Sequence, residues 1–239
     1  MTALRSLLFQ IAFFSVTTIL CFLYIPLLLL PRRFVVKAVL FWSYVVMFLL
    51  RTIVGLTWKV EGGEYLPQGG FLVASKHQSA WETIVFNIIF RDPALVMKQE
   101  LSRLPLWGLY AKFAGHIAID RKGGAATLRA MTGAARNALA EGRPVVIFPQ
   151  GTRVAPGARG ADVPYQPGIA ALYGALNVPV LPVALNSGLF WQRSPFSKKP
   201  GCITVQFLPA LPPQQDKRQV LAALTEKIET ATAALEAKV

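Results

Sequence analysis

The sequence contains few cysteines and few histidines. Only two of its 239 residues are cysteines, Cys21 and Cys202, and they lie far apart along the chain. Such sparse thiols predict neither a disulfide framework nor a zinc cluster. The two histidines, His77 and His116, lie 39 positions apart. We therefore expect no metal site.

Acidic residues are also scarce. Twelve Asp and Glu stand against 25 Lys and Arg, which gives a formal net charge of +13. Such a balance favours anionic partners, of which nucleic acid and anionic lipid are the obvious classes. The first 50 residues hold four bases and no acid, and the remaining 21 bases and 12 acids are spread over residues 51–239. Because no concentrated basic arm is present, we expect no nucleic-acid partner.

Apolar residues, in contrast, are abundant. They make up 54% of the chain against 15% charged residues, and the mean hydropathy is +0.45. That composition excludes a disordered segment. The length accommodates one domain of ordinary size with an appendage, which excludes a fusion of two enzymes.

The appendage is predicted to be a membrane segment. Leu7–Leu30 carries no charge and exceeds the roughly 20 residues that cross a bilayer as a helix. The run ends in Pro31, Arg32 and Arg33 rather than in small residues, so no signal-peptide cleavage site is predicted. A buried helical hairpin in a soluble protein is the alternative interpretation.

A second apolar stretch, Phe34–Leu50, is interrupted by Lys37. About 13 uncharged residues then remain, which is short for a span and favours an interfacial or re-entrant helix. Residues 1–50 are thus expected to form a membrane-associated hairpin or a single span, either across the bilayer or within one leaflet. A two-span hairpin would carry Arg32, Arg33 and Lys37 across the membrane, against the preference of basic loops for the cytoplasm. We therefore expect the cytoplasmic (inner) membrane, with the body of the protein facing the cytosol.

Residues 51–239 read as one α/β domain. Short β-rich runs alternate with helical patterns, which predicts a mixed, mostly parallel sheet with flanking helices. The expected strands are Phe71–Ser75, Leu95–Lys98, His116–Asp120, Val145–Pro149, Val180–Leu185 and Ile203–Leu208. Apolar residues at spacings of three and four predict helices over Ala126–Ala140 and Asp216–Ala237. Val154–Gly168, rich in proline and glycine, is expected to be a loop.

The first polar group follows the strand expected at Phe71–Ser75. Ser79 is a plausible N-cap for a helix that continues through Phe90. His77 then lies before that helix and Glu82 in its first turn, so the pair can meet only if His77 folds back over the helix start. In that geometry the Glu82 carboxylate binds one imidazole nitrogen and raises the basicity of the other. Such a dyad makes a general base without a nucleophile.

The second polar group is Phe148–Arg153, also at a strand end. Gly151 allows close approach of the backbone to a ligand, and Arg153 offers a planar fork of donors to a phosphate or carboxylate. Lys98 and Arg121 end two further strands, and Arg121 is expected at the same sheet edge as Arg153. His116, at a strand start, fits a structural role better than that of a second base.

Taken together, the order of these motifs resembles a known family. His-x4-acid is followed by Ile-Asp-Arg, by Phe-Pro-x-Gly-Thr-Arg, and by Val-Pro-Val-Leu-Pro-Val at residues 178–183. This series resembles the glycerolipid acyltransferases, in particular the 1-acylglycerol-3-phosphate O-acyltransferases, over about residues 55–210.

The resemblance implies a reaction and assigns residues to it. A fatty acyl group would pass from acyl-carrier protein or coenzyme A to the free sn-2 hydroxyl of lysophosphatidic acid in the membrane, giving phosphatidic acid. Neither a metal, a covalent acyl-enzyme nor a cofactor beyond the thioester co-substrate is implied. His77 would take the hydroxyl proton and Glu82 would orient it. Six positions are matched to binding of the acceptor, with the three cations as ligands of its headgroup: Lys98, Arg121, Gln150, Gly151, Thr152 and Arg153.

Several positions depart from the family pattern. The family usually has Asn before the histidine, Asp as the acid and Glu in the third motif, where this chain has Lys76, Glu82 and Gln150. A lysine that often precedes the glycine matched by Gly168 is also absent, and Gln166 stands in that region. Lys76 is expected to compensate for the missing phosphate ligand.

These departures leave other functions open. Another lysolipid, such as lyso-ornithine lipid, is the alternative acceptor, because it would need a weaker phosphate site. A non-catalytic membrane scaffold is the alternative from a different class, since a fold does not imply a function. A lipid hydrolase is disfavoured because the sequence has no Gly-x-Ser-x-Gly nucleophile elbow.

Overall fold

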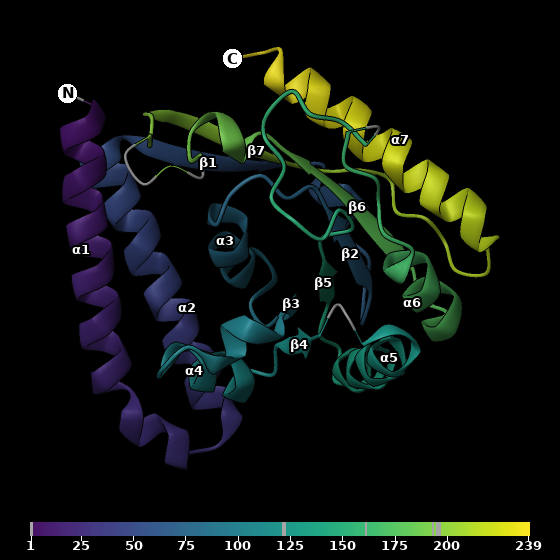
Figure 1. Cartoon of the computed structure of the whole chain (residues 1–239), viewed down its shortest axis with the longest axis horizontal. Coiled ribbons are helices and arrows are strands. Elements are labelled where there is room, and N and C mark those ends of the chain that lie inside the picture. Colours follow the sequence, from purple (N-terminus) through teal and green to yellow (C-terminus); the bar gives the residue numbers. More distant parts are fainter. Residues whose placement is uncertain (1, 121–122, 161, 193, 195–196) are drawn as a thin grey trace.

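The computed structural model describes residues 2–120, 123–160, 162–192, 194 and 197–239. Its centre is a seven-stranded sheet with helices on both faces (Figure 1), in the spatial order β1-β7-β6-β2-β5-β3-β4. The strands are β1 Leu56–Glu61, β2 Leu72–Ser75, β3 Ala94–Lys98, β4 Ile117–Ile119, β5 Val145–Ile147, β6 Val180–Leu185 and β7 Gly201–Phe207.

Five of the six strand pairings are parallel, and only β6 and β7 run antiparallel. The predicted mixed, mostly parallel sheet is therefore confirmed. Every residue of β2, β5 and β6 is buried, because helices cover both faces of the sheet and leave no side of these strands in water. This is why the strands read as uninterrupted apolar runs in the sequence.

Six strands lie where the sequence predicts them, but β1 was not predicted. Leu56–Glu61 includes Lys59 and Glu61, whose side chains are partly or largely exposed. The strand lies at the edge of the sheet and pairs only with β7. Charged residues are typical of such edge strands. Because they interrupt the apolar run, the hydropathy of the sequence does not indicate a strand here.

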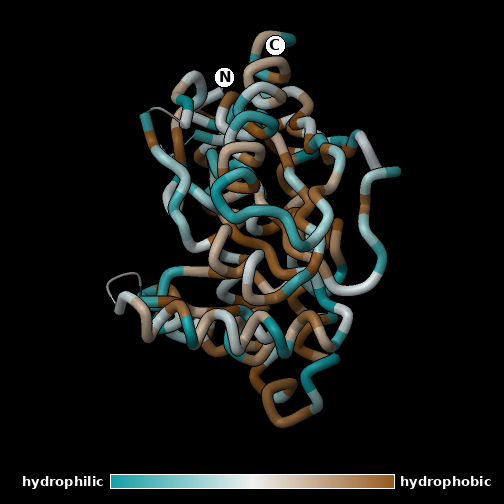
Figure 2. Tube along the Cα trace, turned by 90° about the vertical axis from the view of Figure 1, so that its right-hand side faces the viewer, coloured by the Kyte–Doolittle hydropathy of each residue, from teal (hydrophilic) through white to brown (hydrophobic). Residues whose placement is uncertain are grey.

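Helices cover the sheet on both faces. The helices of the α/β domain are α3 Trp81–Phe90, α4 Trp107–Phe113, α5 Gly124–Ala140, α6 Gly168–Leu176 and α7 Lys217–Glu236. Residues of α5, α6 and α7 form one core with one face of the sheet, and α3 and the N-terminal helices form another core with the opposite face. Figure 2 views the molecule from the side of α5 and α7, with apolar strands inside and hydrophilic residues on the outer helices. The helices predicted at Ala126–Ala140 and Asp216–Ala237 are confirmed as α5 and α7.

The N-terminal segment is a helical hairpin. It consists of α1 Thr2–Leu23, a 3-10 turn at Ile25–Leu29, and α2 Arg32–Leu49, which continues as a π turn through Val54. The second apolar stretch is helical, and α2 runs unbroken past Lys37, whose side chain is exposed. Both α1 and Arg32–Val54 are long and apolar enough to cross a membrane, by length and composition.

The hairpin contacts the α/β domain near the start of α1 and again next to its turn. At the chain start, the Ser6 hydroxyl donates to the Lys198 carbonyl at 3.2 Å and accepts from the Lys198 amide at 3.1 Å. At the turn, Arg32 pairs with Asp92 and donates to the Ala114 carbonyl at 2.9 Å. The hairpin therefore lies along the domain over its whole length, with its turn beside the domain.

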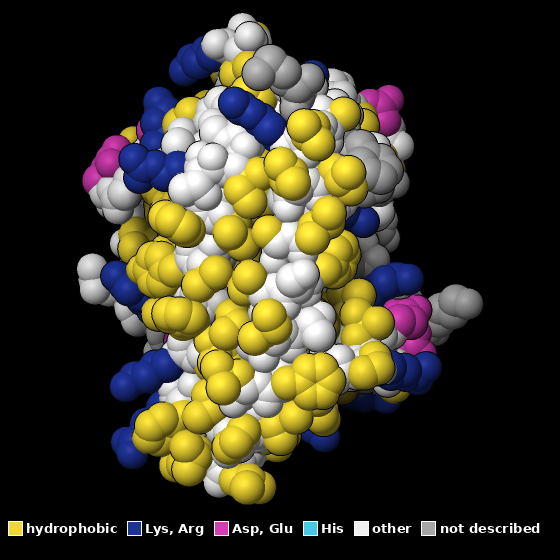
Figure 3. Space-filling view, turned by 90° about the vertical axis from the view of Figure 1, so that its left-hand side faces the viewer, with side chains coloured by type: hydrophobic (Ala, Val, Ile, Leu, Met, Phe, Trp, Pro, Cys, Tyr) yellow, Lys and Arg dark blue, Asp and Glu magenta, His cyan; other side chains and the backbone are white. Residues whose placement is uncertain are grey.

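The outer face of the hairpin is apolar. Its exposed large side chains include Leu8, Ile11, Phe14, Ile19, Phe22 and Phe48. Figure 3 shows hydrophobic side chains covering much of this side of the molecule, with Lys and Arg mostly around its margins. An exposed apolar face of this extent, bordered by bases, indicates membrane association.

Asp92 joins the hairpin turn to the domain and gives a testable prediction. Its carboxylate accepts from Arg32 and, at 3.2 Å, from Nε of Arg143, whose side chain is 8% exposed. Asp92→Asn leaves the buried Arg143 with only the exposed carboxylate of Glu141, 3.5 Å away, as a counter-charge. We therefore expect the free energy of unfolding in detergent to fall by about 1.5–3 kcal/mol. Glu61→Gln, which breaks the exposed Lys59–Glu61 pair, is the control and should cost under about 1 kcal/mol. Equal effects of the two substitutions would contradict this role of Asp92.

Candidate active site

Two predicted polar groups meet at one edge of the sheet. His77 follows β2, and Phe148–Arg153 follows β5, the parallel neighbour of β2. The Lys76 amide still donates to the Val183 carbonyl at 3.0 Å, and the Val154 amide donates to the His77 carbonyl at 2.7 Å. The segments are therefore fixed to one another by their backbones. The carboxyl ends of parallel strands are where open α/β sheets bind ligands.

His77 and Glu82 form the dyad that their spacing predicts. The Nδ1 atom of His77 lies 2.8 Å from Oε1 of Glu82. His77 precedes α3, which begins at Trp81, and Glu82 occupies the first turn of that helix. The side chain of Glu82 is fully buried, whereas that of His77 is 16% exposed. A substrate can therefore reach the imidazole but not the carboxylate.

Glu82 is held by several donors besides the histidine. Oε1 accepts from the amides of Gln78 at 2.6 Å and Ser79 at 2.8 Å. Oε2 accepts from the hydroxyls of Ser79 at 3.0 Å and Ser187 at 2.8 Å. Burial acts to raise the pKa of this carboxyl, but the His77 contact and these hydrogen bonds outweigh burial, and the net shift is downward. The ionised carboxylate then assigns the proton to Nδ1 of His77, so that Nε2 is the basic nitrogen.

Ser79 makes the capping hydrogen bond that its predicted N-cap role requires. The cap position of α3 is Ala80, and the Ser79 hydroxyl accepts from the Trp81 amide at 2.8 Å. Since the same hydroxyl donates to Glu82, Ser79 connects the helix start with the buried carboxylate. Ala80 already has helical backbone angles, so Ser79 directly precedes the first helical residue.

Sequence reasoning missed two residues of the site, Ser187 and Phe148. Ser187 follows β6 in a short 3-10 turn and is fully buried. No motif surrounds it, and its bond to Glu82 joins positions 105 residues apart. The ring of Phe148 stacks on His77, with ring centroids 4.1 Å apart. Phe148 belongs to the motif that was singled out, but its apolar side chain suggested only a strand residue.

The remaining residues of the second motif differ in exposure. Gln150 is buried, and its Nε2 donates to the Val163 carbonyl at 3.1 Å, so it contacts the loop rather than open solvent. Gly151 adopts φ +68° in a tight turn, which glycine tolerates better than other residues. Thr152 and Arg153 are exposed beside this turn and can face a ligand there.

The other predicted ligands are more scattered. Lys98 is exposed at the end of β3, and its Nζ lies 3.4 Å from Oε1 of Glu100. Arg121 lies outside the described residues. The expectation that Lys76 supplies a phosphate ligand is wrong: its side chain is fully buried and Nζ is 2.8 Å from each carboxylate oxygen of Glu229. A buried ammonium that already has a counter-ion cannot reach a headgroup.

His116 is structural, as expected. Its Nδ1 accepts from the Leu95 amide at 3.3 Å. Burial, assisted by the neighbouring Arg143 cation, lowers the pKa of His116 to about 4. The ring is therefore neutral at neutral pH.

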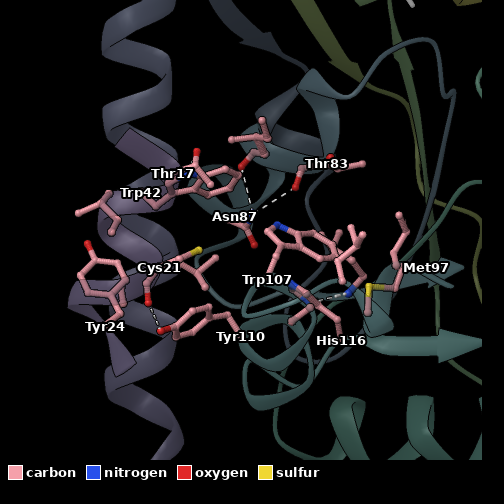
Figure 4. A pocket seen from close by; sticks show the side chains of 18 of the residues that line it. Thr17, Cys21, Tyr24, Trp42, Thr83, Asn87, Met97, Trp107, Tyr110 and His116 are labelled. Carbon is pink, nitrogen blue, oxygen red and sulfur yellow. Dashed lines mark hydrogen bonds between the residues drawn. The ribbon is translucent and has the colours of Figure 1, made fainter. Parts of the chain in front are cut away.

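An apolar cavity of about 230 Å³ extends from Phe148 to the hairpin. Its walls come from α1, α2, α3, α4 and β3 (Figure 4), and Trp42, Met97, Trp107 and Tyr110 are among the larger side chains that line it. His77 does not line this cavity, but Phe148 does, and its ring stacks on the imidazole of His77. The shape and lining of the cavity suit a hydrocarbon chain.

Among the described residues, no group of three or more His, Cys, Asp or Glu side chains is placed to hold a metal ion. The dyad itself is suited to proton transfer by a general base.

Comparison with known proteins identifies the class. Residues 57–186, more than half of the chain, match the family described as Acyltransferase. The chain belongs to this family and is an acyltransferase.

Particular relatives share most of the chain. It is 33% identical over 197 residues to the 1-acyl-sn-glycerol-3-phosphate acyltransferase of Pseudomonas aeruginosa, covering 82% of this chain and 74% of that protein. The enzyme of the same name from Limnanthes douglasii is 28% identical over 192 residues, covering 78% of this chain and 66% of that protein. The crystal structure of the acyltransferase PlsC from Thermotoga maritima superposes with a TM-score of 0.78 at 20% identity, covering 99% of this chain and 98% of that one. This likeness confirms the fold.

The dyad gives a prediction for Glu82. Glu82→Gln removes the charge that orients His77 and stabilises its protonated form, so we expect kcat to fall about 10²–10⁴-fold. The rate is measured as thiol release from an acyl thioester in the presence of a lysolipid. Glu82→Asp keeps the charge, and is the matched control with a loss below about tenfold. Wild-type kcat in the Gln variant would contradict the dyad.

Proposed function

We propose that this chain transfers a fatty acyl group from a coenzyme A or acyl-carrier-protein thioester to the sn-2 hydroxyl of lysophosphatidic acid, giving phosphatidic acid. The observation that carries this proposal is the His77–Glu82 dyad, whose imidazole stacks on Phe148 in the wall of an apolar cavity. The names of the relatives from Pseudomonas aeruginosa and Limnanthes douglasii support the choice of acceptor.

His77 acts as the base in a direct transfer. Its Nε2 takes the proton of the acceptor hydroxyl while the oxygen attacks the thioester carbonyl carbon. The resulting tetrahedral intermediate collapses by breaking the carbon–sulfur bond. The imidazolium gives its proton to the departing sulfur, so that the free thiol leaves and His77 is neutral again. Glu82 stabilises that imidazolium through Nδ1. The atoms balance without a covalent acyl-enzyme or a cofactor beyond the thioester.

The surroundings of His77 suit the two substrates. The apolar cavity accommodates an acyl chain beside Phe148, and exposed Arg153 lies after the neighbouring strand, where an anionic headgroup can be bound. Lys98 and Arg121 are proposed as further headgroup ligands, and Gln150, Gly151 and Thr152 as the wall of that pocket. Both candidate donors are anionic, which the net charge of +13 favours.

One observation keeps lyso-ornithine lipid as a second acceptor. Lys76 is bound to Glu229, and the Gln150 amide donates to the Val163 carbonyl. Neither position then adds a cation to the headgroup pocket, so an acceptor with a weaker need for phosphate binding would also fit.

The hairpin is proposed to lie in the cytosolic leaflet of the inner membrane, with the α/β domain in the cytosol. Contacts at Ser6 and Arg32 hold both of its ends against the domain, which favours insertion into one leaflet over a crossing. The bases around its apolar face favour the cytosolic side, where short basic segments and anionic lipid headgroups gather.

The acceptor is tested by comparing lysophosphatidic acid with lyso-ornithine lipid. Membranes containing the wild type or His77→Ala receive a thioester donor and one acceptor, and the diacyl product is measured. We expect phosphatidic acid from the wild type and a loss of at least about 10²-fold in His77→Ala, because the base is removed. Arg129→Ala, on an exposed position of α5, is the control and should match the wild type.

Two other outcomes would change the proposal. Product from lyso-ornithine lipid alone would replace the acceptor while keeping the chemistry. If neither acceptor gives product, both proposed acceptors are rejected. If product persists in His77→Ala, the proposed role of His77 as the base is rejected.

Topology is tested with a cysteine at Leu29, which is 90% exposed in the hairpin turn. In a variant with Cys21 and Cys202 replaced by serine, a membrane-impermeant maleimide should fail to label Leu29→Cys from the periplasmic side of sealed vesicles, because a hairpin in one leaflet does not reach that side. Protease should cut α7 in inverted vesicles only. Periplasmic labelling would indicate a crossing, and cleavage of α7 in right-side-out vesicles would reverse the orientation.

A further inference from the structure

The two residues that flank His77 are both polar and both buried. Lys76 is fully buried and Gln78 is 2% exposed. Successive side chains of an extended segment point to opposite sides, and each of these two is bonded to α7, whereas His77 contacts Glu82 and Phe148. The segment therefore presents its catalytic side chain to the site and is attached to α7 by the side chains on either side of it.

Glu229 receives the first of these side chains. Both of its carboxylate oxygens lie 2.8 Å from Nζ of Lys76, and the Tyr165 hydroxyl donates to Oε1 at 2.9 Å. Lys76 also donates to the Ala158 carbonyl at 3.3 Å. This carboxylate thus connects the residue before His77 with the loop that follows Arg153.

Glu236 receives the second, two turns further along the same helix face. Its Oε1 accepts from Nε2 of Gln78 at 2.7 Å. Its Oε2 accepts from the Gly157 amide at 3.1 Å and pairs with Arg159 at 2.9 Å. Glu236, like Glu229, therefore binds both the histidine segment and the loop.

We propose that Glu229 and Glu236 of α7 are positioning residues, which together hold the Lys76–Gln78 backbone so that His77 keeps the orientation required for proton transfer. The proposal rests on the proposed role of His77 as the base. Neither glutamate contacts the imidazole, so both act through Lys76 and Gln78. We name the two carboxylates and their five direct partners the α7 clamp. The partners are Lys76, Gln78, Gly157, Arg159 and Tyr165.

The energetics of the ion pair favour positioning over stability. A buried Lys–Glu pair adds little stability compared with well-packed neutral residues, because desolvation of both charges offsets their attraction. Its geometry, in contrast, is directional, since both carboxylate oxygens contact one ammonium. A displacement of a catalytic group by about 1 Å can cost about 10²-fold in rate. A clamp of this kind is therefore expected to be visible in kcat.

The experiment compares three α7 variants in the full-length protein. Glu236→Ala removes the acceptor for Gln78 at the last residue of the helix, where the risk to folding is small. Lys76→Met/Glu229→Gln removes both charges while leaving an acceptor for Tyr165. Glu226→Gln, on the exposed face of α7, is the matched control. The readouts are kcat, the KM for the acyl thioester, and the melting temperature in detergent.

We expect kcat to fall about tenfold or more in Glu236→Ala and in the double variant, with the thioester KM within about twofold of the wild type. Melting temperatures should stay within a few degrees of the wild type, because no unpaired charge is left buried at position 76. Glu226→Gln should match the wild type in all three readouts.

The outcomes separate the clamp from the proposed base. If His77→Ala is inactive but both clamp variants keep wild-type kcat, the clamp is overturned and the base remains. If kcat falls only in proportion to folded protein, the glutamates are structural, and the clamp is again overturned. If His77→Ala keeps wild-type activity, the base and the clamp fall together.

Discussion

The buried carboxylate of Glu82 is the interaction on which the site depends. Burial of an ion is unfavourable, and five hydrogen-bonding groups compensate for it here: the amides of Gln78 and Ser79, the hydroxyls of Ser79 and Ser187, and Nδ1 of His77. These groups come from the segment after β2 and from the turn after β6, and Glu82 itself belongs to the first turn of α3. One charge therefore fixes the relative positions of three segments, and the catalytic imidazole is among the groups it fixes.

Local sequence patterns predict most strands and helices and the His77–Glu82 dyad. They do not predict the contacts that the site makes with residues distant in the sequence. The strands after residue 70 and the meeting of His77 with Glu82 follow from apolar runs and from a spacing of five residues. Ser187 and Glu229 could not be found in this way, because their contacts with the site join positions 105 and 153 residues apart. Lys76 was misjudged for the same reason: a lysine reads as a surface cation until its buried counter-ion is known.

Lys37 interrupts the second apolar stretch of the sequence but not the helix, because it is exposed on the surface of α2. A lysine can keep its ammonium in water while its methylene stem lies along an apolar surface. Arg32, at the end of the first apolar run, contacts Asp92 and the Ala114 carbonyl. The hairpin is thus part of the domain's packing and not only an anchor.

The cavity has walls from both the hairpin and the α/β domain, and this shared boundary affects how an acceptor arrives. If the outer face of the hairpin lies in a leaflet, a lysolipid of that leaflet reaches His77 by lateral diffusion without entering water. The quantity that governs its encounter with the enzyme is then its surface density in the leaflet rather than its concentration in solution. Dilution of the acceptor with inert lipid should accordingly slow the reaction even when the total amount of acceptor in the sample is constant.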